Sequence, residues 1–480
     1  MISRLLYTAV PATIAACLVG SPGLAATTPS GVTLSGHPLG LNVSPQQTAD
    51  VNSGSRSRMD ADLKALGATS FRYGGGTFSD TYDWQISRDT FNDLEQGRQS
   101  DDFTGPGSHY DALDFSVYAR EARAIGASGM VTVNYGSGTP GMAGAWAADI
   151  AKTRAPVAYV EVGNEPYGCS SDNFPITRPP VSDAGYEPND PADCPYAVYG
   201  SAVAGLRKFA ESYKAHAPAF ISAVRAADPA LNIVLPYAIS PPGDGGYVWN
   251  DAVMPAVRGY SGIDVLWYPT RVPGTEYPAQ TVLSWLRDIP ARAAAIKSDI
   301  ARYAPGRFWM LGEDGISNRR TYDVCQPVAA VFAAGSALSW LAEGARYVDW
   351  WKASDSDNAG GHCKNPDYAM FDSTGVAQPP YDGFLLASKL AQPRAVLSAA
   401  NSGNGNVLAF HASLRDGHQG AAIVNLSATS KQTATVPSVG SGAVTVLQYS
   451  AGHPQITRSR MAAQQRTVTV PPDSVTVFVR

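Results

Sequence analysis

Two glutamates in the sequence stand where strand-like apolar segments end. Glu165 follows residues 157–162, and Glu313 follows residues 307–311. Two carboxyl groups held about 5 Å apart can hydrolyse a glycosidic bond with retention of configuration. One protonates the leaving oxygen and later deprotonates water, while the other attacks the anomeric carbon. The pair predicts this chemistry, provided that the fold brings the two strand ends together.

Eight strand-like segments, most of them followed by a helical one, predict a fold that could bring these two strand ends together. The strands are expected at 39–43, 70–73, 130–135, 157–162, 232–237, 263–268, 307–311 and 346–351, with helices at 59–66, 112–125, 196–227, 281–303 and 327–343. Such alternation favours parallel pairing, in a closed barrel or in a doubly wound open sheet. The count of eight, and glutamates at the ends of strands four and seven, favour an α/β fold with a (β/α)8 TIM barrel over residues 37–388.

The composition changes near residue 390. All nine tryptophans lie between Trp84 and Trp351, and helical periodicity fades beyond this point. Short alternating segments replace it, at 407–413, 420–426, 443–449 and 468–479. This pattern predicts a small C-terminal β-sandwich over residues 395–480, which residues 27–36 could join.

The N-terminus has the pattern of a signal peptide over residues 1–25. Arg4 precedes an apolar segment, and small residues at 23–25 precede the expected cleavage point. We therefore expect a secreted or periplasmic protein. A membrane anchor is the alternative, and residues 14–17 also resemble a lipoprotein box in which Cys17 would carry lipid. No other segment is apolar and long enough to span a membrane.

Four cysteines remain after removal of the signal: Cys169, Cys194, Cys325 and Cys363. An even number in an exported chain predicts two disulfides. Three pairings are possible, and Cys169–Cys194 with Cys325–Cys363 is favoured because each closes a local loop. No C-x-x-C spacing supports a metal site instead. Residues 355–360 have calcium-loop spacing, but Pro366 stands where the last acidic ligand is needed, so no metal is expected.

Composition excludes further classes. Aromatic residues make up 10% of the chain, which argues against disorder. The net charge is −5 without a basic cluster, so nucleic acid is not an expected partner. The expected partner is a carbohydrate substrate, and no cofactor is needed for proton transfer and covalent glycosyl exchange. The oligomeric state is left open.

The sequence Gly-Asn-Glu-Pro at residues 163–166, together with Glu313, resembles glycoside hydrolase clan A over roughly residues 37–385. The resemblance implies that Glu165 is the acid/base and that Glu313 is the nucleophile. It also implies that Asn164 contacts the 2-hydroxyl of the sugar.

Other segments resemble the α-L-arabinofuranosidase branch, family 51. Residues 71–76 are similar to its Arg-Trp-Pro-Gly-Gly stretch, and residues 133–139, which contain Asn134 and Tyr135, are similar to its Val-Asn-Leu-Gly-Thr-Gly segment. The resemblance implies an α-L-arabinofuranosidase. The chain departs from the family where Tyr-Gly replaces Trp-Pro, and where residues 266–268 lack an expected His. The β-xylosidase and β-glucuronidase types therefore stay open.

Supporting residues can be predicted as well. Arg72 and Tyr268, at the ends of strands two and six, could hydrogen-bond the nucleophile and keep it ionised. Aromatic residues near strand ends could stack on sugar rings or pack within the barrel: Tyr135, Tyr167, Tyr237, Trp267 and Trp309. Glu161 lies deeper than Glu165, so an interior hydrogen-bonded role is expected, and Asp314 faces away from Glu313.

Two other functions are compatible with parts of the sequence. Residues 136–141 match G-x-G-x-x-G, and Glu161 follows about 20 residues later, as in dinucleotide oxidoreductases. The motif follows the third strand rather than the first, and export would separate the chain from cytosolic dinucleotides. A non-catalytic carbohydrate-binding barrel is the other alternative, since a fold does not fix a function.

Overall fold

The computed structural model describes residues 31–43, 53–80, 82–85, 88–89, 115–136, 138–167, 202–239, 246–270, 276–317, 321–354, 368–372, 374–462, 465 and 467–480. The expected signal peptide, Cys17, Cys169, Cys194, Cys363 and the calcium-like residues 355–360 lie outside them. Cys325 takes part in a disulfide bond, but the predicted pairing stays a prediction. No helix within the described ranges is both long and apolar enough to cross a membrane.

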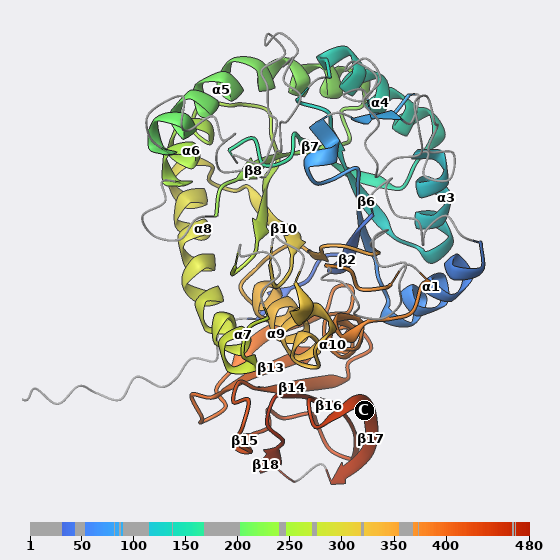
Figure 1. Cartoon of the computed structure of the whole chain (residues 1–480), viewed down its shortest axis with the longest axis vertical. Helices are drawn as coiled ribbons and strands as arrows, with labels where there is room; N and C mark the ends of the chain where they lie inside the picture. The colour runs from blue at the N-terminus through green and yellow to red at the C-terminus, as the bar shows by residue number, and fades with distance from the viewer. Residues whose placement is uncertain are drawn as a thin grey trace, which may run out of the picture.

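Eight parallel strands close into a barrel at the centre of the larger domain (Figure 1). They are β2 (Leu39–Val43), β3 (Ser70–Tyr73), β6 (Ser128–Val133), β7 (Val157–Val162), β8 (Asn232–Tyr237), β9 (Gly262–Trp267), β10 (Phe308–Asp314) and β11 (Val348–Trp350). The strands are almost wholly buried, because helices cover their outer side and side chains fill the interior. The predicted barrel is confirmed.

Helices follow each strand and form a ring around the barrel in Figure 1. They are α1 (Ser53–Leu66), α3 (Phe115–Ile125), α4 (Pro140–Thr153), α5 (Ala202–Ala227), α6 (Gly246–Val253), α7 (Ala279–Trp285), α8 (Ile289–Tyr303), α9 (Val328–Ala342) and α10 (Pro379–Ala387), with short 3-10 turns η1 (Thr77–Asp80), η3 (Leu286–Asp288) and η4 (Tyr322–Cys325). The helix α9 is apolar on all sides because it lies between the barrel and the C-terminal sheet.

The C-terminal region is an antiparallel sandwich, as predicted. One sheet has the order β1-β12-β13-β14-β19-β16-β17, and a two-stranded sheet pairs β15 with β18. The strands are β1 (Val32–Thr33), β12 (Val396–Ala400), β13 (Val407–Ser413), β14 (Gln419–Asn425), β15 (Gln432–Thr435), β16 (Ala443–Ser450), β17 (His453–Ala462), β18 (Thr467–Val470) and β19 (Ser474–Val479). The N-terminal strand β1 pairs with β12, so residues before the barrel extend the sheet. A hairpin of β4 (Tyr82–Asp83) and β5 (Arg88–Asp89) follows η1.

A bulge in β10 orients the residues near its end. The register with β9 shifts between Leu311 and Glu313, so that Gly312 is an extra residue. Trp309 packs on the helix layer, and simple alternation would send Glu313 to that same side. The inserted residue reverses the alternation and turns Glu313 into the barrel. A Cβ at position 312 would lie 2.1 Å from Asp264 Oδ2, so only glycine fits there.

Candidate active site

The guanidinium of Arg72, at the end of β3, is the centre of a buried polar network. Its Nη1 donates to Glu313 Oε1 at 2.6 Å and to Asn42 Oδ1 at 2.9 Å. Its Nη2 donates to Asn164 Oδ1 at 2.8 Å and to Glu161 Oε2 at 2.7 Å. Arg72 is fully buried, so these bonds replace the water that a guanidinium otherwise binds. One side chain thereby links the ends of β2, β3, β7 and β10.

Glu313 is held at both carboxylate oxygens. Arg72 binds Oε1, and the hydroxyl of Tyr268, just after β9, donates to Oε2 at 2.5 Å. Burial and the negative charge of Glu313 raise the pKa of Tyr268 well above its usual range, so the phenol keeps the proton that it donates. The expected contacts of Arg72 and Tyr268 with Glu313 are therefore present.

The pKa of Glu313 reflects opposing influences. Burial raises it to about 7, and the negative charge of Glu165 acts in the same direction. The charge of Arg72 and the hydrogen bonds from Tyr268 and Arg72 lower it. The influence of Glu165 places the two glutamates within electrostatic range of each other, although they come from β7 and β10. The ionised form that attack requires becomes dominant above about pH 7.

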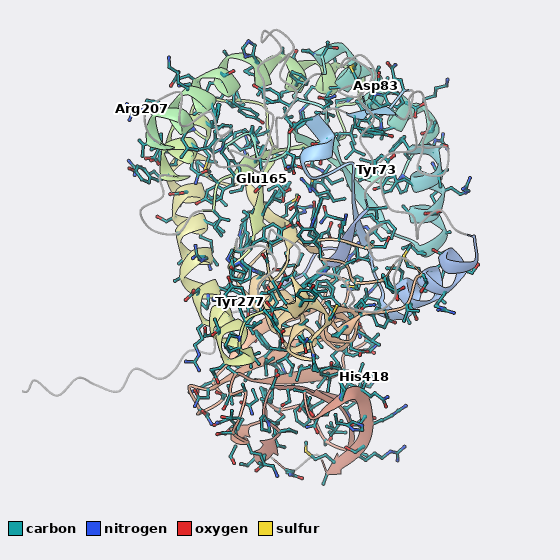
Figure 2. All side chains as sticks on the ribbon, viewed as in Figure 1. Tyr73, Asp83, Glu165, Arg207, Tyr277 and His418 are labelled. Atoms are coloured by element: carbon teal, nitrogen blue, oxygen red, sulfur yellow. The ribbon has the colours of Figure 1, made fainter. Side chains whose placement is uncertain are left out.

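Glu165 follows β7 in a turn that contains two residues with positive φ angles. Gly163 has φ +82°, and a Cβ there would lie 2.7 Å from the Cβ of Tyr135. Glu165 itself has φ +39°, a left-handed conformation that non-glycine residues rarely adopt. Its carboxylate accepts a hydrogen bond from Tyr167 at 3.4 Å. Figure 2 places Glu165 inside the ring of helices.

Asn164 is fixed beside the carboxylates. Its Oδ1 accepts hydrogen bonds from Arg72 and, at 3.1 Å, from the backbone nitrogen of Gly76. These bonds occupy the amide oxygen and set the direction of the amide NH2 group, the half of the side chain that could donate to a sugar hydroxyl.

Two acids lie deeper in the barrel beneath this site. Glu161 accepts from Arg72 and, at 2.7 Å, from the hydroxyl of Thr132. Asp264 Oδ2 lies 3.7 Å from Arg72 Nε. Burial, and then the charge of Glu161, raise the pKa of Asp264 well above its usual range, which favours the neutral carboxyl. Glu161 thus has the interior hydrogen-bonded role that the sequence predicts.

The remaining predicted residues do not join the network. Asn134 accepts from the backbone of Gly138 at 2.9 Å and donates to the carbonyl of Tyr82, so it fixes the loop after β6. Tyr135 packs on Tyr213 with ring centroids 4.9 Å apart. The structure places these two at packing positions.

Trp267 and Trp309 also lie outside the network, on the helix side of the barrel. Trp267 is stacked on Phe332 with ring centroids 5.9 Å apart. Trp309 meets Trp340 edge to face at 5.8 Å. Adjacent residues of a strand face opposite sides. Because Tyr268 points into the barrel, the preceding Trp267 is expected to face the helices, and the sequence alone could have indicated this.

Three residues near the network were not singled out from the sequence. Asn42 donates to the carbonyl of Gly312 at 2.6 Å while accepting from Arg72, and Asp264 was missed as well. Each of these two is a polar residue within an otherwise apolar strand segment, and this pattern could have identified them from the sequence. The third is Trp351, whose indole lies against Gly76 so closely that a Cβ there would meet it at 2.4 Å.

The glycine motif at residues 136–141 is occupied by the protein itself. A Cβ on Gly136 would lie 2.5 Å from the Cβ of Asp80, and one on Gly138 would lie 2.4 Å from the carbonyl oxygen of Asn134. Thr139 caps α4 by accepting from the backbone of Met142. These glycines allow close packing of protein atoms within the loop.

Comparison with known proteins gives structural matches only. No protein-family model and no curated protein sequence matches the chain. The family 51 arabinofuranosidase of Xanthomonas axonopodis pv. citri is 17% identical, with a TM-score of 0.67 over 94% of this chain and 98% of its own. A family 51 α-L-arabinofuranosidase from Bifidobacterium longum is 14% identical, with a TM-score of 0.68 over 95% and 98%.

A third similar structure is a 4-O-α-L-rhamnosyl-β-D-glucuronidase from Fusarium oxysporum. It is 15% identical, with a TM-score of 0.63 over 94% of this chain and 98% of its own. At such identities the likeness shows the fold alone. The resemblance predicted from the sequence is confirmed at that level: the chain has the barrel-and-sandwich architecture of family 51 arabinofuranosidases and of other clan A glycoside hydrolases.

Proposed function

We propose that the chain is a retaining glycoside hydrolase in which Glu165 is the acid/base and Glu313 the nucleophile. The observation that carries the proposal is the double anchoring of Glu313 by Arg72 and Tyr268, within electrostatic range of Glu165. A buried carboxylate held by a cation and a phenol is fixed in direction, and both partners oppose the rise in pKa that burial causes, as a nucleophile requires.

The proposed reaction has two steps. In the first, Glu313 attacks the anomeric carbon, the bond to the leaving group breaks, and the proton of Glu165 moves to the leaving oxygen. In the second, Glu165 takes a proton from water, the water oxygen attacks the anomeric carbon, and the bond to Glu313 breaks. Asn164, held by Arg72 and Gly76, can donate to the sugar hydroxyl next to the reacting carbon.

For the glycone we propose α-L-arabinofuranose. Support comes from the matching segments at 71–76 and 133–139 and from the family 51 structures among the similar folds. The second candidate is a β-glucuronide, since one similar structure is described as a β-D-glucuronidase. A β-xylosidase activity and a barrel that binds sugar without cleaving it are outcomes that the experiment must separate.

The test is a panel of aryl glycosides assayed with wild type and Glu313→Gln. The panel holds the arabinofuranoside, xyloside, glucuronide, glucoside and galactoside. Turnover of one sugar that collapses in the variant supports the proposal and names the glycone. A folded protein that binds arabino-oligosaccharides by calorimetry but turns over nothing would instead be a binder.

Azide separates the two carboxyl roles. If Glu313 is the nucleophile, Glu313→Ala supplied with azide releases the glycosyl azide of inverted configuration, because azide replaces the first displacement. If Glu165 is the acid/base, Glu165→Ala with azide releases the retained azide from the glycosyl-enzyme. The opposite pair of products would exchange the assigned roles.

We also propose export with cleavage after residue 25, in a form with two disulfides. The support is the pattern of residues 1–25 and the participation of Cys325 in a disulfide. N-terminal sequencing of protein from the culture medium, with mass spectrometry of an unreduced digest, tests both. An intact N-terminus in cell extracts, with four free thiols, would contradict them.

A further inference from the structure

We propose that Tyr167 is a positioning residue for Glu165: its hydroxyl orients the carboxylate and sets the pH at which Glu165 releases its proton. The inference rests on the proposed role of Glu165 as acid/base. It adds a residue that acts through Glu165 rather than on the substrate.

The first observation is the conformation of the turn. Glu165 has φ +39°, and such a conformation in a non-glycine residue is unfavourable unless the surroundings hold it. Tyr167 follows two residues later and donates to Glu165 Oε1 at 3.4 Å. The contact is long, so it guides the carboxylate while leaving it able to move toward a leaving oxygen.

The second observation is that Tyr167 is itself fixed. Its ring meets Trp249, on α6, edge to face at 5.7 Å. Trp249 is fully buried and donates to the carbonyl of Pro236 at 3.0 Å. It packs on Tyr213, on α5, at 5.0 Å, and the Tyr213 hydroxyl donates to the carbonyl of Val162 at 2.7 Å. This row of aromatic residues thus returns to the end of β7, the strand that leads into the turn with Glu165.

The direction of the hydrogen bond follows from charge. Burial, and then the negative charges of Glu165 and Glu313, raise the pKa of Tyr167 well above its usual range. The phenol therefore stays protonated, and Glu165 is the acceptor. A donated hydrogen bond favours the ionised form of a carboxyl. Without the hydroxyl, Glu165 would release its proton at higher pH and be less well aimed as an acid.

Tyr167→Phe removes the hydroxyl and keeps the ring that packs on Trp249. Tyr213→Phe is the matched control, since it removes a buried hydroxyl from the same row of aromatic residues without touching Glu165. The chain has only nine glutamates, so glutamate labelled with ¹³C at the carboxyl gives a spectrum simple enough to titrate. Glu165→Gln identifies the resonance of Glu165.

We expect the midpoint of Glu165 to rise by about half a pH unit in Tyr167→Phe, and to stay unchanged in Tyr213→Phe. Using the glycone that the aryl panel identifies, kcat/KM should fall about tenfold for a phenyl leaving group. It should fall less than about twofold for dinitrophenyl, which departs without acid assistance. Tyr213→Phe should lower kcat/KM for both equally, if at all.

Each outcome decides one question. An unchanged midpoint in Tyr167→Phe, or an equal shift in Tyr213→Phe, overturns the positioning role even if the enzyme is active. A shifted midpoint in a protein that hydrolyses no glycoside supports the contact but removes the proposed function. Turnover with equal losses for both leaving groups assigns Tyr167 to general packing and also overturns the inference.

Discussion

Buried acids on the inner and the outer face of the barrel have different partners, and β10 carries one acid of each kind. Glu313 points inward, where a guanidinium and a phenol bind its two oxygens. Asp314, the next residue, points outward to α9, where the hydroxyl of Ser336 donates to Oδ1 at 2.9 Å. Its Oδ2 has no side-chain hydrogen-bond partner among the described residues. Burial raises the pKa of Asp314 to about 8, with only hydrogen bonds to oppose it.

Burial alone therefore does not prepare a carboxyl for nucleophilic chemistry. Both side chains are hidden from water, but only Glu313 has a cationic partner that favours its anion. Asp314 instead keeps its proton and acts as a neutral packing group. The reactivity of a buried carboxyl in this barrel therefore depends on its partners, above all Arg72.

The largest expected effect is a difference in kcat between variants of the two neighbouring acids on β10, Glu313 and Asp314. Glu313→Gln removes the attacking oxygen and should lower kcat at least about 10⁴-fold. Asp314→Asn reproduces the neutral carboxyl and keeps an acceptor for Ser336, so its kcat should stay close to wild type. Steady-state kinetics on the responsive aryl glycoside measure both. A comparable collapse in Asp314→Asn would end the distinction between the faces.

The next effect concerns the cation itself. Arg72→Lys cannot reproduce the guanidinium geometry that serves Glu161, Asn164 and Glu313, and it leaves buried acceptors unpaired. We expect a loss of about 3–5 kcal/mol in the free energy of unfolding, measured by urea denaturation.

Lys297 and Glu343 supply the control for that measurement. They form an ion pair at 2.6 Å on the surface, where both side chains are partly exposed. Lys297→Ala should change the free energy of unfolding by less than about 1 kcal/mol. Equal losses in Arg72→Lys and Lys297→Ala would show that the buried network adds no more than a surface pair.

The sequence was enough to predict most of this architecture. The eight strand segments are visible as apolar runs, and polar residues at strand ends lie together in any closed parallel barrel. Glu165, Glu313, Arg72 and Tyr268 were predicted from their places at strand ends. The resemblance supplied Asn164 and the roles expected of the two glutamates.

What the sequence could not supply is local geometry. The bulge at Gly312 reverses the alternation of β10, so Trp309 and Glu313 face opposite sides although their positions differ by four. The mutual positions of Arg72, Glu161 and Asp264 depend on strand register around the barrel, which no local pattern encodes. The left-handed turn at Glu165 likewise precedes a proline rather than a glycine.

A smaller effect should appear in the dependence of stability on pH. Burial raises the pKa of Asp314 to about 8 and that of Asp473 to about 7, both from 3.8. Between the unfolded and folded values the folded chain holds more protons, so raising the pH favours unfolding. We expect Tm to be highest near about pH 5 and to fall by a few degrees toward about pH 8.

Asp314→Asn tests how much of that decline comes from the outer face. The amide does not titrate, so the fall in Tm between mildly acidic and mildly alkaline pH should be shallower than in wild type, by scanning fluorimetry in matched buffers. A Tm that rises with pH in wild type would show that the buried acids are stabilised as anions.

The smallest effect should come from Asp264, an inner acid that resembles Asp314 in its protonation. It lies 3.7 Å from Arg72, yet Glu161 and Glu313 already bind that cation at hydrogen-bond distance. Neither Asp264 oxygen nor Glu161 Oε1 has a donor among the described residues. A proton on Asp264 would supply one, and the direction in which burial and Glu161 shift the pKa of Asp264 agrees with that arrangement.

Asp264→Asn should therefore be nearly silent, because an amide offers the N–H that the protonated acid offers as O–H, in nearly the same volume. We expect less than about 1.5 kcal/mol of change in the free energy of unfolding and an unchanged pH profile of kcat/KM. Glu161→Gln is the matched variant: it removes the anion that receives both Nε and Nη2 of Arg72 and should reduce both stability and activity. If Asp264→Asn were the more damaging of the two, Asp264 would be the charged partner of Arg72. The charged and the neutral member of the inner pair, Glu161 and Asp264, would then be exchanged.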